Sequence, residues 1–158
     1  MDILLTEADN QVGKTLIGRF ADLGLSVGAA VDFTHPASEL GVPSYPVPPC
    51  KDRGNFVKAV AALNSELHPR WILPVFWPEV LAGTGLPVLC ESADKLLALD
   101  DKLSCCALAS GLGVPQPALY ASPGDVPAYP VVFKRTDGHS GQSVYFPKER
   151  RTLDHLCS

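Results

Sequence analysis

The apolar positions of the first third of the chain alternate between strand-like runs and helical spacing. Residues 3–6 form a short apolar run that predicts a buried strand, and apolar positions within 12–23 recur at helical spacing up to Gly24. Residues 25–31 predict a second strand that ends at Asp32. Because a strand, a helix and a strand follow one another, the pattern indicates a β-α-β unit with parallel strands.

The same alternation continues to about residue 90. Residues 33–54 are rich in proline and glycine and predict a loop with one extended piece at 45–47. The pattern then predicts a helix, a strand, a short helix and a short strand at 56–67, 71–76, 78–82 and 87–90. We therefore expect residues 1–90 to form an α/β domain with a Rossmann-like parallel sheet.

The pattern changes in residues 91–158. Two helices in succession are expected, then a proline-rich break, a short strand, a hairpin and a final polar helix. Their expected ranges are 92–99, 101–110, 113–117, 118–120, 129–146 and 148–158. These residues are expected to form a second domain that is incomplete.

Composition narrows the class of protein. With 46% hydrophobic and 19% charged residues, the 158-residue chain is expected to be globular. Its net charge of −4 comes without any basic block, so no nucleic-acid partner is expected. No apolar run is long enough for a membrane span, and the N-terminus has no cationic leader, so we expect a cytoplasmic protein. The five cysteines and four histidines show no ligand spacing, which favours free thiols and no metal site.

The hairpin is the strongest chemical signal. An apolar run from Tyr129 to Phe133 ends in Lys134, and a loop of small residues follows at 137–143. Such a loop lets the backbone approach a phosphate while the lysine supplies positive charge. This pattern predicts nucleotide binding.

A second phosphate motif competes with it. Ala8 is followed by Gly13-Lys14-Thr15 between the first strand and the first helix, which is a relaxed form of the P-loop pattern and resembles the loop of dethiobiotin synthetase. Glu7 stands against this hypothesis, because it brings a carboxylate next to the phosphate cradle.

The order of motifs in the second half resembles the ATP-grasp superfamily, in particular the carboxylate–amine ligases and the members related to carbamoyl-phosphate synthase. The motifs that carry the resemblance occur in the order Asp101-Lys102, Gly113-Val114-Pro115-Gln116-Pro117, Tyr129 to Lys134, and the loop 137–143. Residues 1–90 look like the Rossmann-like pre-ATP-grasp domain, and 91–158 look like the N-terminal portion of the ATP-grasp domain.

The resemblance implies roles for individual residues. Lys134 matches the lysine that reaches the α- and β-phosphates of ATP, and Lys102 matches an earlier lysine that approaches the nucleotide. The remaining expected nucleotide-binding residues belong to the glycine-rich lid: Asp137, Gly138, His139, Ser140, Gly141 and Ser143. No catalytic residue is assigned.

By resemblance, the whole enzyme would use ATP and Mg²⁺ to convert a small carboxylate into an acyl phosphate, which an amine or a similar nucleophile attacks. The Mg²⁺ ligands are expected outside this chain, so we expect an N-terminal fragment that does not turn over alone. A homodimer and a missing C-terminal portion both stay open as partners. Two alternatives also stay open, namely a P-loop protein that uses Lys14 and Thr15, and a non-catalytic α/β binding module.

Overall fold

The computed structural model describes residues 1–34, 40–136 and 143–158. The chain divides into two compact units, unit 1 (Met1–Leu96) and unit 2 (Leu97–Ser158), and each is described by itself. The domain boundary expected between residues 90 and 91 stays a prediction.

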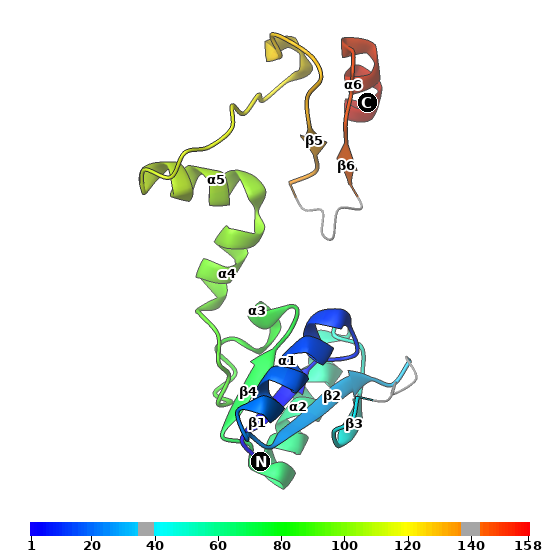
Figure 1. Ribbon diagram of the computed structural model, residues 1–158, viewed down its shortest axis with the longest axis vertical. Helices are drawn as coiled ribbons and strands as arrows, with labels where there is room; N and C mark the ends of the chain where they lie inside the picture. Colours follow the sequence, from blue (N-terminus) through cyan, green and yellow to red (C-terminus); the bar gives the residue numbers. More distant parts are fainter. Residues whose placement is uncertain (35–39, 137–142) are drawn as a thin grey trace. The chain divides into compact units, whose positions relative to one another are not determined.

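Unit 1 is built on a four-stranded parallel sheet with the strand order β3-β2-β1-β4 (Figure 1). The strands are β1 (Ile3–Thr6), β2 (Val27–Asp32), β3 (Ser44–Val47) and β4 (Trp71–Pro74). Ile3 of β1 lies opposite both Val27 and Trp71, so β1 is paired on both sides along its whole length. The expected α/β class with a parallel sheet is confirmed.

Two helices cover the two faces of this sheet (Figure 1). Helix α1 (Gln11–Asp22) buries Ile17 among Leu5 and its neighbours, and α2 (Arg53–Leu67) buries Phe56 and Val60 on the opposite face with Leu4. Because successive side chains of a strand point to opposite faces, β1 supplies apolar side chains to both cores.

Three details of unit 1 differ from the expected elements. The extended piece at 45–47 is a full sheet strand, because an edge strand tolerates the missing N–H of Pro46. Strand β4 ends at Pro74 rather than at residue 76, and the short helix α3 (Pro78–Leu81) follows. The strand expected at 87–90 is reduced to a single bridge between Val88 and Ile72.

Helices are the longest regular elements of unit 2. It contains the last residues of α4 (Ala93–Asp100), then α5 (Lys102–Gly111), the 3₁₀ turn η1 (Pro123–Asp125) and α6 (Arg150–Cys157). The expected hairpin is present but short, with β5 (Phe133–Lys134) antiparallel to β6 (Val144–Tyr145). The expected strand at 118–120 is wrong: these residues are exposed and unpaired with any strand, and β5 and β6 pair with each other instead.

The burial of β1 sets the first testable expectation. Leu4 is fully buried, whereas Leu23 at the end of α1 is 73% exposed. Leu4→Ala should lower the free energy of unfolding of unit 1 by about 2–5 kcal/mol, since it removes buried methyl groups and leaves a cavity. The chemically identical Leu23→Ala should change it by less than about 0.5 kcal/mol. Urea denaturation of both variants measures the difference, and equal losses would contradict this account of the core.

Candidate functional sites

The start of α5 is joined to the end of β5 in unit 2. Asp101 caps α5 by accepting a hydrogen bond from the Ser104 amide at 2.8 Å, and this bond lowers the pKa of the Asp101 carboxyl. Lys102 Nζ donates to the Thr136 carbonyl at 3.1 Å, and the Lys102 amide approaches the same oxygen at 3.5 Å. The sequence-predicted Lys102 is therefore fixed next to the chain that leaves β5.

Lys134 lies in the same region. It is exposed, and its backbone pairs with Val144 across the hairpin. The Arg135 amide donates to the Ser143 carbonyl at 3.4 Å, so Ser143 lies where the two sides of the hairpin separate. Asp137, Gly138, His139, Ser140 and Gly141 lie outside the described residues.

The rings of Phe133 and Tyr145 support this hairpin. Their centroids are 6.0 Å apart with the ring planes tilted by 43°. Aromatic cross-strand pairs of this kind stabilise a short antiparallel ladder. The pair therefore holds the backbone of Lys134 in a defined position beside Thr136.

In the P-loop-like turn of unit 1, the Asn10 side chain binds the backbone amides that a phosphate would need. Asn10 Oδ1 accepts hydrogen bonds from the Val12 and Gly13 amides at 2.9 and 3.0 Å, and these amides would otherwise face a phosphate. A Cβ on Gly13 would lie 2.4 Å from the Ala8 carbonyl oxygen, so close packing alone requires this glycine. The local geometry does not favour the P-loop hypothesis.

A different cluster lies at the carboxyl end of the same sheet. The chain runs from β1 to β2 and β3 on one side of β1, and then to β4 on the other side, so the strand order reverses between β1 and β4. Open α/β sheets bind ligands beyond the carboxyl ends of their strands at such a point. Glu7 follows β1 directly, and Glu79 lies in the first turn of α3 after β4.

Glu7 is a carboxyl group in an unfavourable environment for charge. Burial is the main cause that raises its pKa to about 7, and the nearby carboxylates of Asp9, Glu79 and Asp32 add to the effect. A hydrogen bond with the Cys50 thiol acts in the opposite direction. At neutral pH a substantial fraction of Glu7 therefore carries a proton.

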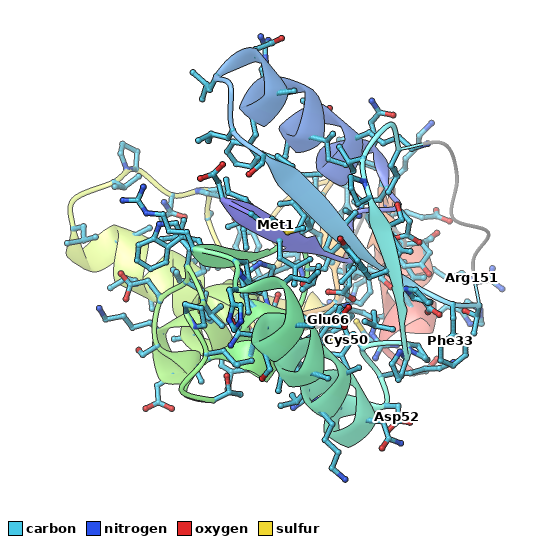
Figure 2. The ribbon with its side chains drawn as sticks, turned by 90° about the horizontal axis from the view of Figure 1, so that it is seen from below. Met1, Phe33, Cys50, Asp52, Glu66 and Arg151 are labelled. Atoms are coloured by element: carbon cyan, nitrogen blue, oxygen red, sulfur yellow. The ribbon has the colours of Figure 1, made fainter. Side chains whose placement is uncertain are left out.

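Cys50 comes from the segment between β3 and α2, close in sequence to the α2 N-cap Asp52 (Figure 2). Burial, followed by the Glu7 carboxylate, raises the pKa of the Cys50 thiol to about 12, so the thiol does not ionise at neutral pH. On the rim of the cluster, an Arg53 guanidinium nitrogen lies 3.8 Å from a Glu79 carboxylate oxygen.

The sequence interpretation did not find the contact between Glu7 and Cys50. It treated Glu7 as an objection to a P-loop and Cys50 as a free thiol. An acidic residue directly after a buried strand was the available signal, but the contact with Cys50 depends on the position of β3, which the sequence interpretation left inside a loop.

Within the described residues, no group of three or more His, Cys, Asp or Glu side chains is arranged to hold a metal ion. A search of the same residues for a helix both long enough and apolar enough to cross a membrane finds none.

Comparison with known proteins assigns the fold. No family model and no curated protein sequence matches the chain. Solved structures do match it, among them an L-amino acid ligase from Bacillus licheniformis at 17% identity, with a TM-score of 0.72 over 98% of this chain and 41% of that one. N5-carboxyaminoimidazole ribonucleotide synthetase from Thermus thermophilus matches at 19% identity and a TM-score of 0.69, over 97% of this chain and 42% of that one.

A third similar structure is the biotin carboxylase domain dimer of 2-oxoglutarate carboxylase from Hydrogenobacter thermophilus, in complex with MgADP, ADP and bicarbonate. It is 17% identical, with a TM-score of 0.67 over 98% of this chain and 39% of that one.

These structures share with the chain an α/β fold with a parallel N-terminal sheet. More narrowly, they are ATP-grasp enzymes, and the chain has the fold of their N-terminal region. The chain spans about two fifths of the length of the solved structures that it matches. The resemblance inferred from the sequence is confirmed at the level of the fold.

Glu7 makes the stability of unit 1 depend on pH. Because its folded pKa of about 7 lies above the ordinary value of 4.5 for a glutamate, Glu7 contributes stability below about pH 4.5 that is lost as the pH rises through about 7. Glu7→Gln should flatten this dependence, so that the variant gains stability relative to the native chain as the pH rises. Denaturation at several pH values measures the difference between the two chains, in which the common contribution of the histidines cancels. Parallel curves would contradict the assignment.

Proposed function

We propose that this chain supplies the N-terminal part of an ATP-grasp ligase, in which Lys102 and Lys134 bind the phosphates of ATP. The hydrogen bond from Lys102 Nζ to the Thr136 carbonyl carries the proposal. It ties the start of α5 to the chain two residues beyond Lys134, so both ammonium groups belong to one small region of unit 2. Ser143 closes the same region through the Arg135 amide. Asp137, Gly138, His139, Ser140 and Gly141, which connect the two sides, are proposed to cover the phosphates.

The electrostatics of this region suit a polyphosphate. Lysine ammonium groups are strongly hydrated point charges that bind phosphate oxygens without the planar geometry that arginine requires. The N-terminus of α5, where Lys102 is the first residue, is capped by the Asp101 carboxylate. The positive charge proposed to bind the phosphates therefore comes from the two lysines.

The proposed reaction follows from the resemblance. A carboxylate oxygen of the substrate attacks the γ-phosphorus of ATP, ADP leaves, and the acyl phosphate loses phosphate when an amine or a similar nucleophile attacks its carbonyl carbon. The similar biotin carboxylase domain holds MgADP and bicarbonate, which supports ATP, Mg²⁺ and a small carboxylate as ligands. We assign the Mg²⁺ ligands to residues outside this chain, and a cytoplasmic location and a homodimer are part of the same proposal.

Nucleotide binding by the two lysines can be tested against the P-loop alternative. Lys134→Ala and Lys102→Ala should each weaken ATP binding by about tenfold, or roughly 1.4 kcal/mol, since each removes a charge from the phosphates. Lys14→Ala is the matched control and should leave the affinity unchanged. Isothermal titration of the four chains with ATP makes the comparison.

The pattern of losses distinguishes the alternatives. A loss with Lys14→Ala alone would establish the P-loop hypothesis instead. If the native chain shows no affinity for ATP while its fold is intact, the proposal fails. That result would favour the alternative of a non-catalytic α/β binding module.

A further inference from the structure

We propose that Phe133 and Tyr145 are positioning residues for Lys134. Their ring contact keeps the lysine on the face of the β5–β6 hairpin from which it binds phosphate, so the affinity for ATP depends on two side chains that do not touch the nucleotide. The inference rests on the proposed function and deepens it, because it names what holds one of the two phosphate-binding lysines in place.

The pairing of β5 with β6 separates the rings from the lysine. In this antiparallel hairpin Phe133 lies opposite Tyr145, and Lys134 lies opposite Val144 (Figure 1). Side chains of directly opposed residues share a face, and successive side chains of a strand alternate between the faces. The two rings therefore lie on one face and Lys134 on the other. A shift of the pairing by one residue would turn Lys134 to the opposite face.

The ladder that fixes this register is short. Each strand has two residues, and two further backbone hydrogen bonds flank the ring pair. The Val131 amide donates to the Pro147 carbonyl at 3.1 Å on one side, and the Arg135 amide donates to the Ser143 carbonyl at 3.4 Å on the other. An isolated two-stranded hairpin is at best marginally stable in water, so cross-strand side-chain pairs decide how fully it forms.

Burial fixes only the base of the hairpin. Pro147 is fully buried, so its pairing with Val131 is anchored in the packed part of unit 2. Beyond it, Lys134 is exposed and Tyr145 is 42% exposed. The ring centroids of Phe133 and Tyr145 lie 6.0 Å apart, within the range of favourable aromatic pairs. This contact therefore stabilises the part of the ladder in which Lys134 lies.

The same part of the ladder sets the distance between the two lysines. Lys102 Nζ donates to the Thr136 carbonyl at 3.1 Å, which holds Lys102 against the chain two residues beyond Lys134. Opening of the ladder changes both the direction of Lys134 and its distance from Lys102. A ligand binds more weakly when the competent state of its site is only partly populated, so loss of the ring pair lowers the apparent affinity for ATP.

The test compares the ATP affinities of variants of the whole 158-residue chain by isothermal titration. Tyr145→Val removes the ring but keeps a residue suited to a strand, and it should weaken ATP binding about fivefold, as expected for the loss of an aromatic pair. Tyr145→Phe retains the ring and should bind as the native chain does. Tyr120→Val is the matched control, because Tyr120 lies in the same unit outside the hairpin and is 44% exposed. It should leave the affinity unchanged.

A double-mutant cycle with Lys134→Ala separates positioning from general stability. Because Tyr145 acts through Lys134, Tyr145→Val should cause no further loss of ATP affinity in a chain that already carries Lys134→Ala. Hydrogen exchange gives a second readout. The amides of Lys134 and Val144 should exchange faster in Tyr145→Val, whereas the amides of α5 should exchange as in the native chain.

The inference is overturned if Tyr145→Val binds ATP like the native chain, or if Tyr145→Phe or Tyr120→Val loses as much affinity as Tyr145→Val. It is also overturned if the loss is equal with and without Lys134, or if the amides of α5 exchange faster as well. Absence of ATP binding by the native chain, or unchanged binding by Lys134→Ala, would instead reject the proposed function. The two failures are therefore distinguishable.

Discussion

The parallel pairing of β1 on both of its sides is the constraint on which unit 1 depends. Ile3 to Thr6 are all buried, and each lies in register with β2 on one side and with β4 on the other. Four residues thus satisfy their backbone groups, supply side chains to both cores and fix where the chain leaves the sheet. The position of Glu7 beside Cys50 and Glu79 follows from this pairing, because strand ends that are in register bring their following loops together.

The two units differ in how many of their side chains are buried. Unit 1 has a core on each face of its sheet, whereas in the described part of unit 2 only Pro147 and Leu153 are buried. An open groove of about 640 Å³ lies between α5 and the proline-rich segment 113–119, with apolar side chains such as Leu103, Val114 and Leu119 along it. Local hydrogen bonds and the Phe133–Tyr145 contact, rather than a large core, therefore hold together the region around β5 and the start of α5.

The sequence predicted the elements of unit 1 well because their apolar periodicity is strong. Strand β1, helix α1 and the following strand were expected close to their observed bounds. Strand β3 was harder, because Ser44–Val47 contains a proline and becomes a strand only when β2 offers a partner edge. The strand expected at 118–120 failed for the converse reason, since a short apolar run without a neighbouring strand gains no ladder hydrogen bonds.

The two candidate sites also differ in how far the sequence predicted them. Lys102 and Lys134 were available from linear motifs, and the structure adds the contact with Thr136 that relates them. The contact between Glu7 and Cys50 was not available, because the two residues are separated by a long stretch of chain and meet only through the strand order.

Glu7 also breaks local rules of backbone geometry and of burial. Its φ of 56° lies in the left-handed region, which costs a non-glycine residue about 1–3 kcal/mol, and its carboxyl is buried among other carboxylates. A glycine or asparagine would satisfy the turn at lower cost. Places where sequence and local physics disagree tend to be functional. The backbone strain and the buried carboxyl therefore occur together at the carboxyl end of β1, where the strand order reverses and where open α/β sheets bind their ligands.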